Sequence, residues 1–518
     1  MPTVPLESSA GRWVLIATIM ASAMAFIDGT ALNVVLPSLQ KNLNASGPDL
    51  FWILNAYLLI LAALILVGGS LGDRLGRKKV FMIGILIFIL GSAACGLAPD
   101  VVYLIAFRMI QGIGGALMIP GSLSLLSSSI DEKQRGKAIG TWSAFTTVVT
   151  IGGPILGGAL ADAGLWRYIF FINLPIGLGA LVILRNKVAE SRSDSPAAPI
   201  DIPGVITIAL GLACLTFGFL RMPALGFDSW QVLLTLIAGL VLLIAFVVIE
   251  KKSPSPMMPL HLFANSNFSG ANLLTLFLYA GLGIAMLFLS LNMIQIQGYT
   301  QLQSGLTFLP FTILMITIAR PAGTLADKFG PRLLLILGPA TAGVGLLTLS
   351  FVGQTKGASD YMTTFLPGIL VFGLGLSFTV APLTTTVMKS VNDEFSGTAS
   401  GINNAVSRIA NVFANAVFGA LAVVFFSNAL QKQLPTSFPD RAAIIKQTAN
   451  LGNAKPPASL DPTSATTARQ AYREGFIVTY SRIMRCASTL AFLGALMAIL
   501  FIRRHPGPKI TSNRLENP

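Results

Sequence analysis

The sequence predicts an all-α protein that crosses a membrane many times. Of its 518 residues, 53% are hydrophobic and only 11% are charged, and the mean hydropathy is +0.74. A chain of this composition cannot cover its surface with polar groups in water. Its apolar residues fall into long runs, and a helix needs about 20 such residues to cross the bilayer core. We therefore expect about fourteen spanning helices.

The expected spans form two sets of six with a pair between them. The first set runs near 13–36, 51–71, 80–98, 102–125, 138–162 and 169–185. The pair lies near 203–220 and 230–249, and the second set near 268–295, 303–324, 332–352, 363–387, 400–427 and 477–502. The resulting units are an N-terminal segment (1–12), a first bundle (13–185), a linker (186–202), an inserted pair (203–249), a second bundle (250–502) with a long loop near 428–474, and a tail (503–518).

A glycine-and-charge hinge recurs in the two sets and explains this division. Residues 69–79 read GSLGDRLGRKK, and a weaker copy, GTLADKFGPR, occupies 323–332. The copy follows the second span of its set only if the pair at 203–249 is an insertion. Parallel repeats of this kind are a transporter architecture, with the substrate site between the halves near the middle of the membrane.

Basic residues predict the orientation of the helices. The net charge is +14, from 35 Lys and Arg against 21 Asp and Glu. We attribute it to cytoplasmic loops rather than to nucleic-acid binding, because basic residues concentrate in alternate loops: Arg74, Arg77, Lys78, Lys79, Lys133, Arg135, Lys137, Arg185, Lys187, Arg192, Lys251, Lys252, Lys328, Arg332, Arg503 and Arg504. Both termini are then expected in the cytoplasm of a plasma (inner) membrane protein. The 428–474 loop is expected outside.

Other chemistries find no support in the sequence. The three cysteines, Cys95, Cys214 and Cys486, all lie in apolar segments, and the chain has two histidines, so neither a disulfide framework nor a metal site is expected. A nucleotide-binding loop of the type G-x-x-x-x-G-K-[ST] is missing, so ATP is not the expected energy source. We predict no enzyme activity and no cofactor, with a proton gradient as the energy source.

The hinge resembles the loop between helices two and three of the major facilitator superfamily, G-x-L-a-D-r-x-G-r-k. The resemblance implies a conformational role for these positions. Glycines allow helices to approach closely, and an aspartate at a helix end can face the positive N-terminus of another helix. The expected gating residues are Gly69, Asp73, Arg74, Gly76 and Arg77, with Asp327 in the copy. The copy lacks several charges, so we expect an asymmetric gate.

Two further elements resemble one branch of that superfamily. The run GGPILGG at 152–158 resembles the G-P-x-x-G-G element of proton-driven exporters, which implies a role for Gly153, Pro154, Gly157 and Gly158. Proline there removes a backbone donor and the glycines permit close packing. The run WRYIFFINLPIG at 166–177 resembles W-R-W-i-F-x-i-N-x-P-i-G, a hallmark of the fourteen-helix drug:proton antiporters (EmrB/QacA type).

Asp28 is the candidate for proton coupling. It is the only carboxylate that we find well inside a predicted span, and an acid within the membrane is functional by default. Burial disfavours its charge and so promotes proton uptake and release. The surrounding residues, Asp28, Thr30, Asn33, Leu36 and Pro37, also resemble the family's D-x-T-x-x-N-x-A-L-P element.

Arg108 is the predicted partner of Asp28. It opens a run that resembles the family's R-x-x-q-G-x-g-a element in the fourth span. Asp28 lies roughly 22 Å above the inner end of its helix, and Arg108 about 10 Å below the outer end of its own. In a core about 30 Å thick these depths nearly coincide. We therefore expect the two side chains to meet when the cavity is closed to substrate.

The predicted function is a proton-driven exporter of amphipathic drugs or toxic organic compounds that works by alternating access. An exporter dedicated to one metabolite, such as an antibiotic or siderophore, is an alternative. A proton-coupled importer and a non-transporting receptor are less favoured. The expected partners are the lipid bilayer, a small amphipathic substrate and protons. A periplasmic adaptor protein is a further candidate partner that depends on the cell envelope.

Overall fold

The computed structural model describes residues 4–190, 201–392 and 395–503. A few side chains inside these ranges also lie outside the description, among them those of Asp73, Arg74 and Asp327. Within the described residues the regular structure is helical, apart from a single bridge between Val4 and Ile130.

Thirteen described helices are long and apolar enough to cross a membrane, and α5 adds a shorter apolar stretch, Val148–Asp162. The N-terminal half holds α1 (Ser9–Leu43), α2 (Gly47–Leu75), α3 (Arg77–Leu97), α4 (Val101–Ser129), α5 (Glu132–Asp162), α6 (Tyr168–Phe171) and α7 (Asn173–Lys187). An inserted pair follows, α8 (Ile202–Leu225) and α9 (Trp230–Lys252). The C-terminal half holds α10 (Ser266–Leu291), α11 (Gln301–Leu306), α12 (Leu309–Phe329), α13 (Arg332–Leu349), α14 (Phe365–Lys389), α15 (Ser396–Gln433), α16 (Arg441–Lys446) and α17 (Pro462–Phe501). The all-α, multi-pass fold class is confirmed.

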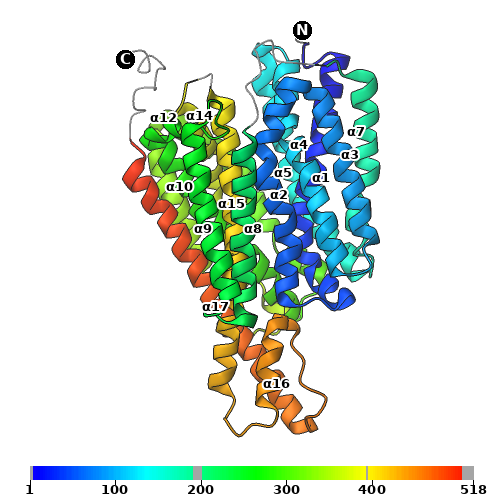
Figure 1. Cartoon of the computed structure of the whole chain (residues 1–518), viewed down its shortest axis with the longest axis vertical. Coiled ribbons are helices and arrows are strands. Elements are labelled where there is room, and N and C mark those ends of the chain that lie inside the picture. Colours follow the sequence, from blue (N-terminus) through cyan, green and yellow to red (C-terminus); the bar gives the residue numbers. More distant parts are fainter. Residues whose placement is uncertain (1–3, 191–200, 393–394, 504–518) are drawn as a thin grey trace.

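The two halves repeat one pattern of helix packing (Figure 1). In the N-terminal half α1 packs on α5 and α7, and α4 packs on α2 and α3. In the C-terminal half α10 packs on α15 and α17, and α14 packs on α12 and α13. The same four pairings therefore occur in each half, in the same chain order.

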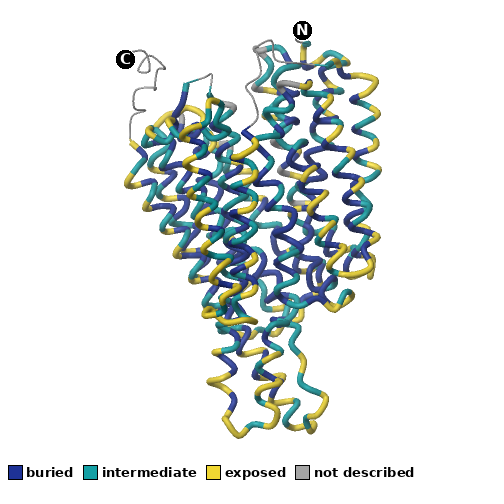
Figure 2. Tube along the Cα trace, in the orientation of Figure 1, coloured by how far each residue is buried: buried dark blue, intermediate teal, exposed yellow. Residues whose placement is uncertain are grey.

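The inserted pair lies at the side of the molecule. Helix α8 packs on α2 of one half and α15 of the other, and α9 packs mainly on α8. The outward face of α9 carries aliphatic side chains that are more than half exposed, including Leu234, Ile237 and Ile244. Figure 2 marks exposed residues in yellow, and they recur along the helices that Figure 1 labels α8 and α9. Apolar side chains facing outward along a whole helix are expected where lipid replaces water.

The two ends of the molecule differ in charge, and we name them accordingly. At the basic end α1 begins and α17 ends, and Lys78, Lys79, Arg185 and Lys251 lie at the helix termini there. At the far end α1 leads into α2, and α15 and α17 run on into a small domain that projects from the bundle (Figure 1).

This projecting domain contains the segment predicted as a long loop near 428–474, and the segment includes helical structure. Helix α17 begins at Pro462, about 15 residues before the predicted span, because Asp461 accepts hydrogen bonds from the backbone of Thr463 and Ser464 and so caps it. Ile444 of α16 is fully buried, and its carbonyl accepts a hydrogen bond from Tyr472 Oη at 3.0 Å. The segment is polar in overall composition, so its sequence did not indicate that Ile444 and Tyr472 are buried.

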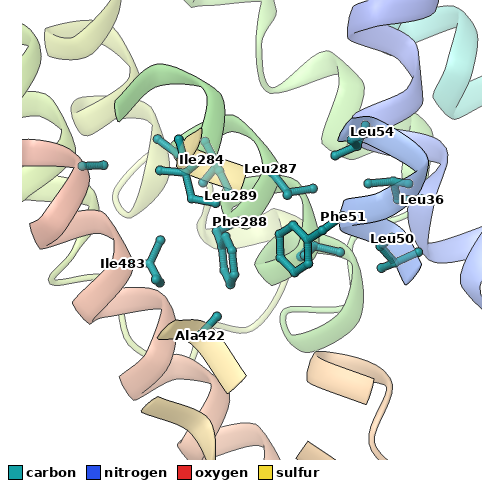
Figure 3. Close-up of a cluster of buried hydrophobic side chains, with 14 of the residues drawn as sticks. Leu36, Leu50, Phe51, Leu54, Ile284, Leu287, Phe288, Leu289, Ala422 and Ile483 are labelled. Atoms are coloured by element: carbon teal, nitrogen blue, oxygen red, sulfur yellow. The ribbon is translucent and has the colours of Figure 1, made fainter. Parts of the chain in front are cut away.

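An apolar cluster joins the two halves near the far end (Figure 3). Phe51 of α2 stacks on Phe288 of α10 with ring centroids 6.3 Å apart, and Phe288 stacks in turn on Phe476 of α17. Each of these rings is at most 1% exposed. Burying such a side chain stabilises the packed state by about 1.5–3 kcal/mol. The cluster therefore favours an arrangement in which the halves are closed together at the far end.

Candidate functional site

Asp28, Arg108 and Gln111 form a closed polar network inside the N-terminal half. Arg108 Nη1 donates to Asp28 Oδ2 at 2.5 Å and to Gln111 Oε1 at 2.8 Å. Gln111 Nε2 completes the ring by donating to Asp28 Oδ1 at 2.9 Å. The structure thus brings Asp28 of α1 and Arg108 of α4 into contact, with exposed fractions of 2% and 1%.

The surroundings of this network hold the arginine in place. The guanidinium carbon of Arg108 lies 4.4 Å from the centroid of the Tyr57 ring, and its Nε donates to the carbonyl of Ile53 at 3.3 Å. Cys95 Sγ lies 3.8 Å from Gln111 Oε1. A buried ion pair persists only when additional hydrogen bonds satisfy its remaining polar atoms. Here both carboxylate oxygens of Asp28 have partners, so the pair is well compensated.

The other two predicted coupling residues lie outside the network. Thr30 Oγ1 donates to the carbonyl of Phe26 in its own helix at 2.8 Å. Asn33 is partly buried, and among the described contacts no hydrogen bond joins it to Asp28 or Arg108. The polar residue that completes the network is instead Gln111, which belongs to the sequence run that Arg108 opens.

The glycines of α5 let that helix touch two neighbours at once. A Cβ added at Gly153 would collide with Thr30 Oγ1, and one at Gly157 would fall 2.8 Å from the carbonyl oxygen of Ala31. These two glycines face α1, immediately beyond Asp28. Gly158 faces α11 of the other half, where an added Cβ would fall 2.7 Å from Leu302 Cα. These three glycines therefore set how closely α5 approaches α1 and α11.

A polar latch joins the halves at the far end beside these glycines. Asp162, at the end of α5, accepts hydrogen bonds from the backbone N–H groups of Gln301 and Leu302, both at 2.9 Å. The carboxylate thus caps the N-terminus of α11. Gln301 Nε2 also donates to Ser38 Oγ, and Gln40 Nε2 donates to the carbonyl of Asn450 at 3.0 Å. Sequence reasoning missed this latch, because its members are ordinary polar residues at helix ends.

The hinge region at the basic end contains an acidic partner that sequence reasoning also missed. Glu190, which follows α7, accepts hydrogen bonds from the backbone N–H groups of Lys78 and Lys79 at 3.0 and 3.1 Å. It therefore caps α3 at the hinge. Gly76 lies between α2 and α3 with φ of 111°, and Gly69 is part of α2. The side chains predicted to gate, Asp73, Arg74 and Asp327, lie outside the described residues, so their role stays a prediction.

Replacement of Gly76 by alanine is expected to destabilise the folded protein by about 1–3 kcal/mol, because a non-glycine residue at positive φ is strained. Its Cβ would also lie 2.7 Å from Glu190 Cδ. Gly69→Ala is the matched control, since its Cβ would meet only Pro120 Cβ at 3.9 Å. Thermal unfolding of the purified variants in detergent measures the difference. Equal melting temperatures for the two variants would contradict a strained hinge.

Arg408 of α15 is a charged residue inside a span that sequence reasoning overlooked. It lies twelve residues after the start of α15, a helix that packs on both α2 and α10. It makes no hydrogen bond or ion pair within the described part of the chain, and its Nε atom is buried without a partner. A lone basic residue in an apolar run was the available signal, the same one that identified Asp28.

Comparison with known proteins places the chain in a family. The model of the Major Facilitator Superfamily matches residues 18–415. The chain is similar to the tetracenomycin C resistance and export protein of Streptomyces glaucescens, with 30% identity over 97% of this chain and 94% of that protein. It is also similar to the multidrug resistance protein Stp of Mycobacterium tuberculosis, with 34% identity over 82% of this chain and 78% of that protein.

Solved structures agree on the fold. An auto-inhibited peptide transporter of the POT family aligns with a TM-score of 0.65 at 15% identity, covering 96% of this chain and 98% of the other. A bacterial homologue of the lysosomal transporter Spinster, in its inward-facing and unoccupied conformation, aligns with a TM-score of 0.62 at 17% identity, covering 97% of this chain and 100% of the other. The chain therefore belongs to the Major Facilitator Superfamily, as a multi-pass membrane transporter related to drug resistance and export proteins.

Proposed function

We propose that the protein exports amphipathic organic compounds in exchange for protons, by alternating access of a site between its two halves. The observation that carries this proposal is the buried network of Asp28, Arg108 and Gln111. Asp28 accepts one hydrogen bond from Arg108 and one from Gln111. A proton bound to Asp28 therefore removes the charge that holds Arg108.

Proton binding in such a site is necessarily coupled to structural change. Breaking a buried ion pair by neutralising one partner costs about 3–5 kcal/mol, because the other charge stays buried and unpaired. The arrangement with the pair intact is therefore the deprotonated one. Proton uptake favours a different arrangement of α1 and α4, in which Arg108 finds another partner or water. A ligand that prefers one of two states shifts the equilibrium by its differential affinity.

The far-end contacts support the second element of the proposal, a gate. Asp162 with the start of α11, and Phe51 with Phe288, close the halves together at the far end. The basic end is cytoplasmic in this proposal, because basic residues collect at the helix termini there. The closed far end is then the outer gate. In this proposal the described arrangement is the one that is shut from outside, with the Asp28–Arg108 ion pair intact.

Inverted membrane vesicles with an acidic interior test coupling and direction together. We expect an added substrate to enter the vesicles and to make the interior less acidic, because each substrate is exchanged for protons that leave. A pH-sensitive dye inside the vesicles reports the change. Vesicles without the protein are the control. An interior that becomes more acidic would indicate symport, and entry of substrate without any pH change would exclude proton coupling.

Export of a single metabolite is the second candidate function. It is favoured by the names of relatives, which include the tetracenomycin C resistance and export protein and a probable actinorhodin transporter of Streptomyces coelicolor, 31% identical over 84% of this chain. The vesicle assay separates the two candidates when it is run with dyes and antibiotics of unrelated structure. Transport of several unrelated compounds favours a multidrug exporter, and transport of one favours a dedicated exporter.

A further inference from the structure

We propose that Arg408 binds an acidic group of the transported compound, so that the substrate class is aromatic molecules carrying a carboxylate or phenolate. This inference rests on the proposed transport function and names its substrate class. Asp28 and Arg108 neutralise each other in a closed network, with both Asp28 oxygens occupied. Arg408 then contributes a positive charge without a carboxylate partner among the described residues.

The position of Arg408 makes it available to a ligand between the halves. Helix α15, which carries Arg408, packs on α2 of the N-terminal half and on α10 of the C-terminal half, so this helix lies at the interface of the halves. The side chain is partly exposed, while its Nε atom is buried and lacks a hydrogen-bond acceptor. A guanidinium that loses hydration without gaining an acceptor is costly, and a bound anion removes that cost.

Arg408 also belongs to a polar stripe on α15. Asn404, Arg408, Asn411 and Asn415 follow one another at helical spacing and so lie on one face. Asn415 Nδ2 donates to Asn55 Oδ1 of α2 at 3.2 Å, which closes the stripe toward the far end. Asn404, one turn from Arg408 toward the basic end, is exposed. The stripe thus runs from the exposed Asn404 to the buried Asn415. A binding surface in a transporter that is closed at the far end has the same orientation.

The neighbouring side chains suit an aromatic scaffold beside the acidic group. Tyr57 of α2 and Tyr279 of α10 belong to two helices on which α15 packs, and each offers an aromatic ring and a hydroxyl donor. The Tyr57 ring is already covered by Arg108 on one side, at 4.4 Å. An arginine forks two parallel N–H groups toward a carboxylate, which fixes orientation as well as charge. A cationic compound, by contrast, meets the repulsion of Arg408 and finds Asp28 already paired.

Two dyes with the same three-ring xanthene core test this inference. Fluorescein is anionic at neutral pH and rhodamine 123 is cationic, and their binding to the full-length protein in lipid nanodiscs is measured by fluorescence polarisation. We expect the protein to bind fluorescein more tightly than rhodamine 123. Arg408→Gln should weaken fluorescein binding about tenfold or more, because it removes a charge-assisted contact, and should leave rhodamine 123 binding unchanged or stronger.

Arg408→Lys serves as the rescue variant, since it keeps the charge and should recover part of the fluorescein affinity. Rhodamine 123 binding to Arg408→Gln shows that this variant is folded. Equal fluorescein affinity in the original protein and in Arg408→Gln would overturn the inference. Loss of both dyes together would also overturn it, as would failure of the original protein to bind fluorescein. The assay uses no gradient, so failure of proton-coupled export in vesicles would leave this result standing and would be recognised separately.

Discussion

Replacement of Asp28 by asparagine is expected to abolish proton-driven export while leaving the protein abundant in the membrane. Asparagine has nearly the same volume and keeps an oxygen that can accept from Arg108 or Gln111, whose bonds to Asp28 are 2.5 and 2.9 Å long. It cannot bind and release a proton in the accessible range. The variant should therefore fail to accumulate substrate in vesicles with an imposed pH gradient.

A second measurement separates loss of coupling from loss of transport. Exchange of labelled for unlabelled substrate across the membrane needs the alternating motion but no net proton movement. We expect Asp28→Asn to retain exchange at a reduced rate, whereas Asp28→Glu should retain some gradient-driven accumulation because it keeps a titratable group. Full accumulation by Asp28→Asn under a pH gradient would show that the proton binds elsewhere.

Replacement of Gly158 by alanine is expected to stop transport by preventing closure of the far end. The added Cβ would fall 2.7 Å from Leu302 Cα and collide with the carbonyl oxygen of Gln301, and backbone atoms cannot swing away as a flexible side chain can. Overpacking of this kind costs about 1–3 kcal/mol, which shifts the equilibrium between the two states about five- to 150-fold. The protein should accumulate with its far end open.

Gly152→Ala is the matched control for this prediction, because no atom lies within 4 Å of the Cβ that it would add. Accessibility is read out with a cysteine placed at Leu54, which is 7% exposed in the apolar cluster, and a thiol reagent that cannot cross the membrane. The reagent, applied from outside, should label this cysteine faster in the Gly158→Ala background than in the Gly152→Ala background. Equal labelling and equal transport would contradict the assigned role of Gly158.

Hydrophobic runs and charge bias predicted the fold because the bilayer restricts the choices. A spanning segment must satisfy its own backbone, so each long apolar run becomes a helix. The same constraint made Asp28 conspicuous, since an acid in such a run has no other explanation. The start of helix α17 could not be predicted from hydrophobicity. Its first turns lie outside the apolar run, and the capping residue Asp461 decides where they begin.

The sequence by itself determined the order of the helices and the isolated charge at Asp28, because these follow from local hydrophobicity. It also indicated the repeated halves and the inserted pair, because the glycine-and-charge hinge recurs at 69–79 and 323–332. Only the tertiary structure decided which side chains meet. Gln111 completes the Asp28–Arg108 network, Asp162 caps α11 across the interface, and Asn415 of α15 donates to Asn55 of α2. Such contacts join residues up to hundreds of positions apart, and close packing between helices, rather than any local pattern, selects them.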